Sequence, residues 1–226
     1  MKKHNMEKET LIKIEHLKKT FNNVDVIKDL TVDLNAGDRI ALIGQNGAGK
    51  TTLIRCILGL YTFEGYLSVL GKSPRTDREK VLQEVGFVPQ LPPPLKMTVA
   101  EIMEFFSIIT KTDQEKFIQI ANDLKLDVSK HLHKPFLKLS GGMKQKLLVS
   151  LALARNPKIL LMDEPSANLD PEARIVLFNY LKNLPEDTLM ILSSHRVDEI
   201  EDLVNRLIEM DLGEIIIDKT LKPVLS

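Results

Sequence analysis

Short apolar runs along this chain alternate with segments in which apolar residues recur every three or four positions. Two continuous apolar runs, 159–162 and 189–192, have the length of strands that are buried on both faces of a sheet. Apolar residues with strand-like spacing at 11–14 and 30–34 flank the polar pair Asn22-Asn23 and predict an antiparallel layer. Strands that alternate with helices favour an open, mostly parallel α/β sheet with its ligand at the carboxyl ends of the strands.

The segment 90–139 differs from the rest of the chain in its pattern of residues. Three consecutive prolines predict a stiff stretch, and helical patterns follow at 99–109 and 116–126. We interpret 90–139 as a helical subdomain inserted into a catalytic core formed by 10–89 and 140–226, the whole chain being one domain. The simpler alternative is that these segments are ordinary crossover helices of the sheet.

Charge and cysteine content narrow the function classes. Lys plus Arg and Asp plus Glu both number 31, so no overall cationic field attracts nucleic acid, and no nucleic-acid partner is expected. The single Cys56 excludes an internal disulfide and reads as a small buried hydrophobe, which suits a reducing cytoplasm. The chain has no run of about 18 apolar residues that would span a bilayer. A membrane role therefore requires another polypeptide.

A glycine-rich sequence follows the apolar run 40–43 and fits the phosphate-loop pattern G-x-x-x-x-G-K-[ST]. Its glycines let backbone N–H groups surround a phosphate, Lys50 supplies a charge for the phosphate oxygens, and Thr51 is placed to ligate Mg²⁺. Apolar spacing at 53–58 predicts a helix whose N-terminus adds attraction for phosphate. The alternative is a glycine-rich turn that binds nothing. The residues expected to contact nucleotide here are Gly44, Gln45, Asn46, Gly47, Ala48, Gly49, Lys50, Thr51 and Thr52.

Two acidic residues end the apolar run 159–162. Asp163, at the end of a buried strand in a sheet that also carries a phosphate loop, is placed to hold Mg²⁺. The adjacent Glu164 is a candidate general base that orients and deprotonates the attacking water. Without the phosphate loop, a plain Asp-Glu-Pro surface turn would be the better interpretation.

A second glycine-bearing helix start follows Leu139. Ser140 is a natural N-cap, and Gly141 and Gly142 let a second phosphate approach exposed backbone N–H groups. Capping alone explains Ser140, but it does not explain two glycines in the first turn of a helix.

The sequence Leu-Ser-Gly-Gly-Met-Lys-Gln at 139–145 is similar to the signature of ATP-binding cassette (ABC) transporter ATPases, and the whole chain resembles their nucleotide-binding subunit. By this resemblance Gln90 is the Q-loop glutamine that touches Mg²⁺ and water, and Phe21 stacks on adenine. Residues 166–170 resemble the D-loop, and His195 resembles the switch histidine, which completes a catalytic set with Lys50 and Glu164.

Each assignment has a plainer alternative. Phe21 could pack in the core at a strand end, and His195 alone would be a satisfied structural histidine. Asp170 before a proline has the pattern of a helix start, a role compatible with contact to nucleotide. His131 and His133 lack metal-ligand spacing and are typical of a solvent-facing loop.

The resemblance implies an ATP-binding and ATP-hydrolysing subunit that requires ATP and Mg²⁺ and drives an ABC transporter by ATP-driven dimer closure. Its partners would be a second copy or a similar ATPase subunit, and integral membrane permease subunits on separate chains at the cytoplasmic face. The sequence Met-Lys-Gln-Lys at 143–146 is most similar to that of the ABC-2-type exporter group. The alternative is a soluble or cell-envelope-linked ABC ATPase that acts as a non-transport mechanical or scaffold module.

Overall fold

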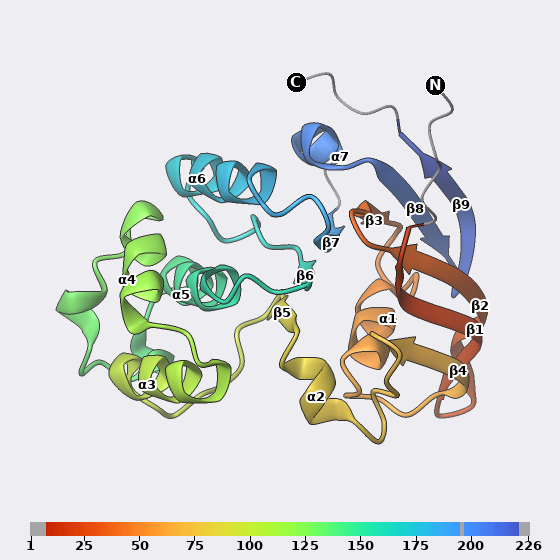
Figure 1. The fold of residues 1–226 in the computed structure, drawn as a ribbon, viewed down its shortest axis with the longest axis horizontal. Helices are drawn as coiled ribbons and strands as arrows, with labels where there is room; N and C mark the ends of the chain where they lie inside the picture. The colour runs from red at the N-terminus through yellow and green to blue at the C-terminus, as the bar shows by residue number, and fades with distance from the viewer. Residues whose placement is uncertain (1–7, 195–196, 222–226) are drawn as a thin grey trace.

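The chain folds into two β-sheets with helices around the larger one, as the computed structural model shows for residues 8–194 and 197–221 (Figure 1). The strands are β1 (Thr10–Phe21), β2 (Val24–Asn35), β3 (Arg39–Ile43), β4 (Glu64–Val69), β5 (Val85–Val88), β6 (Ile159–Asp163), β7 (Leu189–Ser193), β8 (Arg206–Asp211) and β9 (Glu214–Thr220). The α-helices are α1 (Lys50–Ile57), α2 (Arg78–Leu82), α3 (Val99–Thr110), α4 (Gln114–Asp123), α5 (Gly141–Ala154), α6 (Pro171–Lys182) and α7 (Val197–Ile200).

The smaller sheet is the antiparallel layer predicted at the N-terminus. Its strand order is β2-β1-β4, and β1 pairs antiparallel with both neighbours. A two-residue turn joins β1 to β2 because Asn22 and Asn23 both adopt positive φ, 47° and 64°, a conformation that asparagine tolerates well. Phe21 pairs with Val24 across this turn and so lies at the very end of β1.

The larger sheet has the order β5-β6-β7-β3-β8-β9 and is parallel except for β9. Alternate residues of β6 enter different apolar clusters: Leu160 packs in the cluster with α5 and α6, whereas Leu161 packs in the cluster with α1 and the smaller sheet. Both faces of the strand are therefore covered, which explains why its sequence is continuously apolar. The expected α/β phosphate-loop fold with an antiparallel layer is confirmed.

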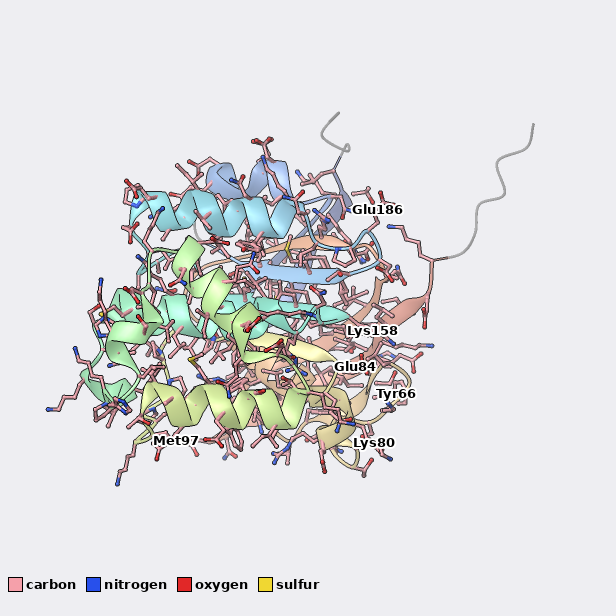
Figure 2. All side chains as sticks on the ribbon, turned by 60° about the vertical axis from the view of Figure 1, so that its left-hand side comes forward. Tyr66, Lys80, Glu84, Met97, Lys158 and Glu186 are labelled. Carbon is pink, nitrogen blue, oxygen red and sulfur yellow. The ribbon has the colours of Figure 1, made fainter. Side chains whose placement is uncertain are left out.

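The direction of the strands places their ends at opposite sides of the molecule. Glu84, Lys158 and Glu186 precede β5, β6 and β7 and lie along one edge (Figure 2). The carboxyl ends of the same strands therefore point to the opposite edge, where ligands bind in open α/β sheets.

The predicted helical segment contains α3 and α4, joined through two 3₁₀ turns (Val128–His131 and Phe136–Lys138) to α5. Helix α3 begins with a capping box in which the Thr98 side chain accepts from the backbone N–H of Glu101. Helix α4 ends three residues before its predicted end at 126. The division into a core and an inserted subdomain stays a prediction, although both helices were located correctly.

Cys56 is fully buried in α1, as the sequence predicts. Burial raises the pKa of its thiol to about 11, so the thiol stays protonated and unreactive near neutral pH. Within residues 8–194 and 197–221 we find no helix with the length and apolar character needed to cross a bilayer.

Replacing Phe117 in α4 tests the packing of the helical segment. Phe117 is fully buried, so Phe117→Ala should lower the free energy of unfolding by about 3–5 kcal/mol in urea denaturation. The matched control is Phe105→Ala on α3, since Phe105 is half exposed and its loss should change stability by roughly 0.5 kcal/mol or less. Equal losses for the two variants would contradict this packing.

Candidate functional site

The phosphate loop runs from the end of β3 to the start of α1 and depends on glycine at defined positions. Gly44, Gly47 and Gly49 have φ of 145°, 86° and 106°, in the region that favours glycine. A Cβ on Gly44 would lie 2.2 Å from the backbone oxygen of Met210 in β8, so no side chain fits there. The loop residues 45–52 and Val26 of β2 line a pocket of about 120 Å³, the right place for a phosphate at a helix N-terminus.

Lys50 is folded over this loop. Its Nζ donates to the backbone oxygens of Gly44 at 2.6 Å and Gln45 at 3.2 Å, and the residue is only 7% exposed. Burial lowers the pKa of Lys50 from its ordinary value, and the carboxylates of Glu164 and Asp163 oppose this shift. The ammonium is therefore held inside the loop, where phosphate oxygens would be better partners than the two carbonyls.

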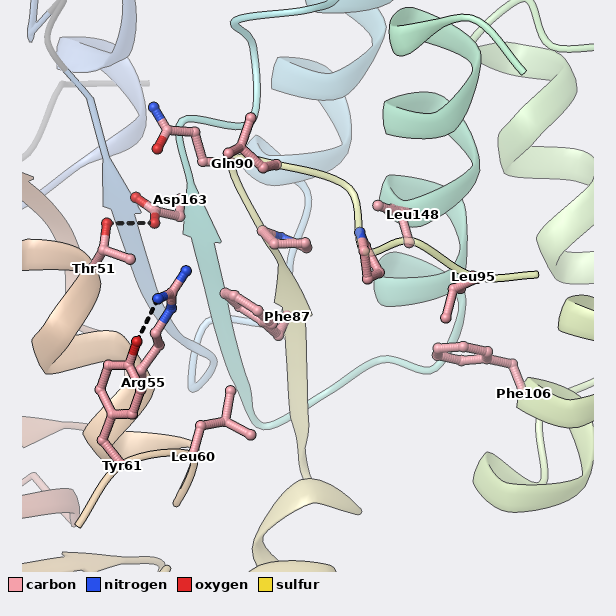
Figure 3. A pocket seen from close by; sticks show the side chains of 13 residues that line it. Thr51, Arg55, Leu60, Tyr61, Phe87, Gln90, Leu95, Phe106, Leu148 and Asp163 are labelled. Atoms are coloured by element: carbon pink, nitrogen blue, oxygen red, sulfur yellow. Dashed lines mark hydrogen bonds between the residues drawn. The ribbon is translucent and has the colours of Figure 1, made fainter. Parts of the chain in front are cut away.

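The hydroxyl of Thr51 donates to Oδ2 of Asp163 at 2.7 Å (Figure 3). This contact joins the first turn of α1 to the carboxyl end of β6, and Asp163 is 3% exposed. The other carboxylate oxygen, Oδ1, accepts a hydrogen bond from the Ser193 hydroxyl at the end of β7. Two of the three predicted metal-site residues, Thr51 and Asp163, are thus brought together, and Ser193 is a neighbour that the sequence analysis missed.

Glu164 occupies a strained corner directly after β6. Its φ is +52°, in the left-handed region that costs a non-glycine residue about 1 kcal/mol or more. Its backbone N–H donates to Ser193, at 3.2 Å from the carbonyl oxygen and 3.1 Å from Oγ. Eight other described non-glycine residues also have positive φ, so the conformation is not confined to the site, but here it belongs to the predicted general base.

The second glycine-bearing corner, Ser140–Gly142, starts α5 and is exposed at its first two residues. Ser140 caps the helix by accepting from the backbone N–H of Met143 at 3.2 Å, as predicted. Ser140 and Gly141 are exposed, and within residues 8–194 and 197–221 a Cβ on Gly141 would meet nothing within 4 Å. A Cβ on Gly142 would lie 2.9 Å from the backbone oxygen of Asn168. Close packing therefore accounts for Gly142, whereas no contact among the described residues accounts for Gly141.

Helix α5 is tied to the segment that follows Glu164. Gln145 donates from Nε2 to the backbone oxygen of Pro165 at 3.3 Å, and Lys146 forms an ion pair with Asp170 at 2.6 Å. Asp170 also caps α6 by accepting from Ala173 at 2.9 Å. The hydrogen bond from Lys146 is the main cause of the lowered pKa of Asp170. The expected capping role of Asp170 is present, and the contacts of Gln145 and Lys146 were not foreseen.

Phe21 lies at the end of β1 with 36% of its surface exposed, which leaves part of the ring open to a nucleobase. Its edge meets Tyr61 at a centroid distance of 5.1 Å, and Lys19 lies 4.4 Å from its centroid. No sequence pattern marked Tyr61, because it lies in the irregular segment between α1 and β4.

Gln90 follows β5 and lines a pocket of about 610 Å³ together with Thr51 and Asp163 (Figure 3). The rest of the wall is largely apolar and includes Leu91 and Phe106. Gln90 thus shares a cavity with the predicted metal ligands. The remaining predicted site residue, His195, lies outside the described residues.

A phosphate loop, a buried aspartate at the end of the neighbouring strand and an adjacent glutamate define a phosphate-loop nucleoside triphosphatase. Comparison with known proteins assigns the family: residues 27–167 match the model of the family described as ABC transporter. The chain therefore belongs to the ABC transporter ATP-binding proteins, and its activity is that of an ATPase.

Two curated relatives and one solved structure illustrate the similarity. The "Uncharacterized ABC transporter ATP-binding protein YdbJ" of Bacillus subtilis (strain 168) is 31% identical over 92% of this chain and 68% of its own length. The "Phosphonates import ATP-binding protein PhnC 2" of Oceanobacillus iheyensis is 29% identical over 92% of this chain and 90% of its own length. The "Dimeric structure of a post-hydrolysis state of the ATP-binding cassette MJ0796 bound to ADP and Pi" has a TM-score of 0.80 at 22% identity, over 94% of this chain and all 100% of that one.

Gly44→Ala should disrupt the phosphate loop, because the added Cβ would collide with the carbonyl of Met210 and the position needs positive φ. We expect a lower Tm and a smaller rise of Tm on adding ATP in thermal unfolding. Gly141→Ala is the control, since its Cβ would meet nothing and the Tm should not change. An unchanged ATP-dependent rise of Tm in Gly44→Ala would contradict the role of the loop.

Proposed function

We propose that this chain is the ATP-hydrolysing subunit of a transporter and works as a head-to-tail pair with a second copy or a similar subunit. Each ATP lies between the phosphate loop of one subunit and the Ser140–Gly142 helix start of the other. The observation that carries this proposal is the exposed second corner, where a Cβ on Gly141 would meet no described residue within 4 Å beyond its own helix turn. A helix N-terminus that offers free N–H groups to solvent suits a phosphate brought by another molecule.

The residues of one chain divide the work at the phosphates. Backbone N–H groups of residues 44–52 cradle the nucleotide, Lys50 neutralises phosphate charge, and Phe21 offers a ring face to the adenine. Glu164 accepts the proton of the attacking water as general base. His195 donates a hydrogen bond to the γ-phosphate, a role that rests on the family resemblance alone.

The site fits Mg²⁺. The Thr51 hydroxyl and the Asp163 carboxylate are hard oxygen ligands already within 2.7 Å of each other, and Gln90 lines the same cavity. We propose these three residues as the metal set, reached directly or through water. A bound Mg²⁺ would neutralise phosphate charge and hold the triphosphate in one orientation.

Transport requires membrane partners, which we propose to be permease subunits on separate chains at the cytoplasmic face. The pocket beside Gln90 combines a metal-site residue with exposed apolar side chains such as Leu91, which is 78% exposed. A movement of Gln90 on ATP binding would therefore be transmitted to a permease subunit bound at this pocket. The exporter direction stays a prediction, because a relative named for phosphonate import is about as similar as the other curated relative.

A scaffold that binds ATP without transport is the second candidate, because it would use the same nucleotide site. Steady-state ATPase activity with and without co-purified membrane proteins separates the two candidates. A transporter subunit should change its rate when its permease is present, whereas a scaffold should hold ATP with little turnover.

Glu164→Gln keeps the shape of the side chain but removes the base. We expect ATP binding and an accumulated closed dimer, with hydrolysis slowed by roughly 10²–10⁴-fold. The control is Glu115→Gln on the exposed start of α4, which should hydrolyse at the native rate. Native-rate hydrolysis by Glu164→Gln would remove Glu164 from its role.

Ser140→Arg places a bulky cation on the exposed corner. Because the phosphate loop is untouched, we expect ATP to bind each chain with native affinity while sedimentation velocity detects no ATP-dependent dimer. Ser129→Arg adds the same side chain at another exposed serine and should still dimerise. An ATP-dependent dimer of Ser140→Arg would show that the sandwich geometry is wrong.

A further inference from the structure

Ser193 ends β7 inside the site, although neither the phosphate-loop pattern nor the family resemblance singles it out. It lies opposite Asp163 of β6 on one side and Leu42 of β3 on the other, and it is 0% exposed. The other residues of β7 are the apolar set expected of a buried strand. A hydroxyl at this one position therefore calls for a chemical reason.

The direction of its hydrogen bonds is fixed by its partners. A backbone N–H can only donate, so the hydroxyl oxygen accepts from the N–H of Glu164 at 3.1 Å. The single hydroxyl proton is then directed to Oδ1 of Asp163, with which Ser193 is hydrogen-bonded. One side chain thus contacts both acidic residues of the neighbouring strand.

These contacts fix the carboxylate of Asp163 from two sides. Ser193 holds Oδ1 and the Thr51 hydroxyl holds Oδ2. If Thr51 turns to a metal ion, its bond to Oδ2 is given up and Ser193 remains to set the plane of the carboxylate. Groups that orient a metal ligand in this way raise the affinity of the site.

The same hydroxyl supports the strained backbone at Glu164. Glu164 has φ of +52°, and its N–H donates to both the carbonyl oxygen and the hydroxyl of Ser193. Removing the hydroxyl would leave one acceptor and free the corner to relax toward ordinary φ.

A comparison within the chain separates this role from simple filling of the core. Ser150 in α5 is also fully buried, but its hydroxyl donates to the backbone oxygen of Leu147 in its own helix at 2.8 Å. That bond is local and reaches no site residue. The hydroxyl of Ser193 instead crosses from one strand to the next at the proposed metal ligand.

We propose that Ser193 is a positioning residue that orients Asp163 toward the metal and holds the backbone of Glu164 in its strained conformation. This proposal rests on the proposed function, in which Thr51 and Asp163 bind the metal of the metal–ATP complex.

The test measures metal binding rather than turnover. Mn²⁺ affinity is determined by electron paramagnetic resonance in the presence of a non-hydrolysable ATP analogue, and metal-free nucleotide affinity is determined separately in EDTA. Ser193→Ala and Ser193→Cys should bind Mn²⁺ roughly ten- to a hundredfold more weakly, with unchanged metal-free nucleotide affinity. Ser150→Ala is the matched control and should match the native protein in both measurements.

Native Mn²⁺ affinity in both Ser193 variants would overturn the proposal. An equal loss of metal-bound and metal-free nucleotide affinity, or failure of both variants to fold, would also overturn it, because either result assigns Ser193 a merely structural role. Asp163→Asn identifies failure of the proposed function itself: native Mn²⁺ affinity in that variant would place the metal away from Asp163, whatever Ser193 does.

Discussion

The site depends on the approach of Thr51 to Asp163, whose hydrogen bond joins two segments 112 residues apart in the sequence. It can form only if β3, β6 and β7 run parallel and end at the same edge, since the phosphate loop follows β3 and Asp163 ends β6. The apolar runs that bury these strands on both faces therefore also determine where the chemistry occurs. The packing that stabilises the parallel strands therefore also fixes the position of the site.

The second glycine-bearing corner, Ser140–Gly142, lies apart from these strand ends. The phosphate loop, Asp163 and Glu164 gather at the strand ends, whereas Ser140 and Gly141 form the exposed start of α5, a helix that is buried from Gln145 onward. The contacts of Gln145 with Pro165 and of Lys146 with Asp170 link that helix to the segment following Glu164. In the proposed pair, a nucleotide of the partner subunit held at Ser140–Gly142 would thus be linked through α5 to Asp163 and Glu164.

Sequence patterns predicted the elements whose signals are long or chemically specific. The runs at 159–162 and 189–192 became β6 and β7, each one residue longer, and the added residues are Asp163 and Ser193. Strand β5 escaped notice because it has four residues and includes Gly86, and the β8–β9 hairpin because apolar and charged residues alternate irregularly at a sheet edge. Ser193, and Tyr61 beside Phe21, were missed because their contacts are with residues distant in the sequence, which no local pattern encodes.

A mixing experiment with two inactive chains tests the central claim that two chains share each ATP. Lys50→Ala lacks a working phosphate loop and Ser140→Arg lacks a working Ser140–Gly142 helix start, so each variant alone should be inactive. A mixed pair regains one complete site, made of the phosphate loop of the Ser140→Arg chain and the Ser140–Gly142 helix start of the Lys50→Ala chain. The account predicts ATP hydrolysis in the mixture well above the sum of the separate chains, and a mixture no more active than that sum would contradict it.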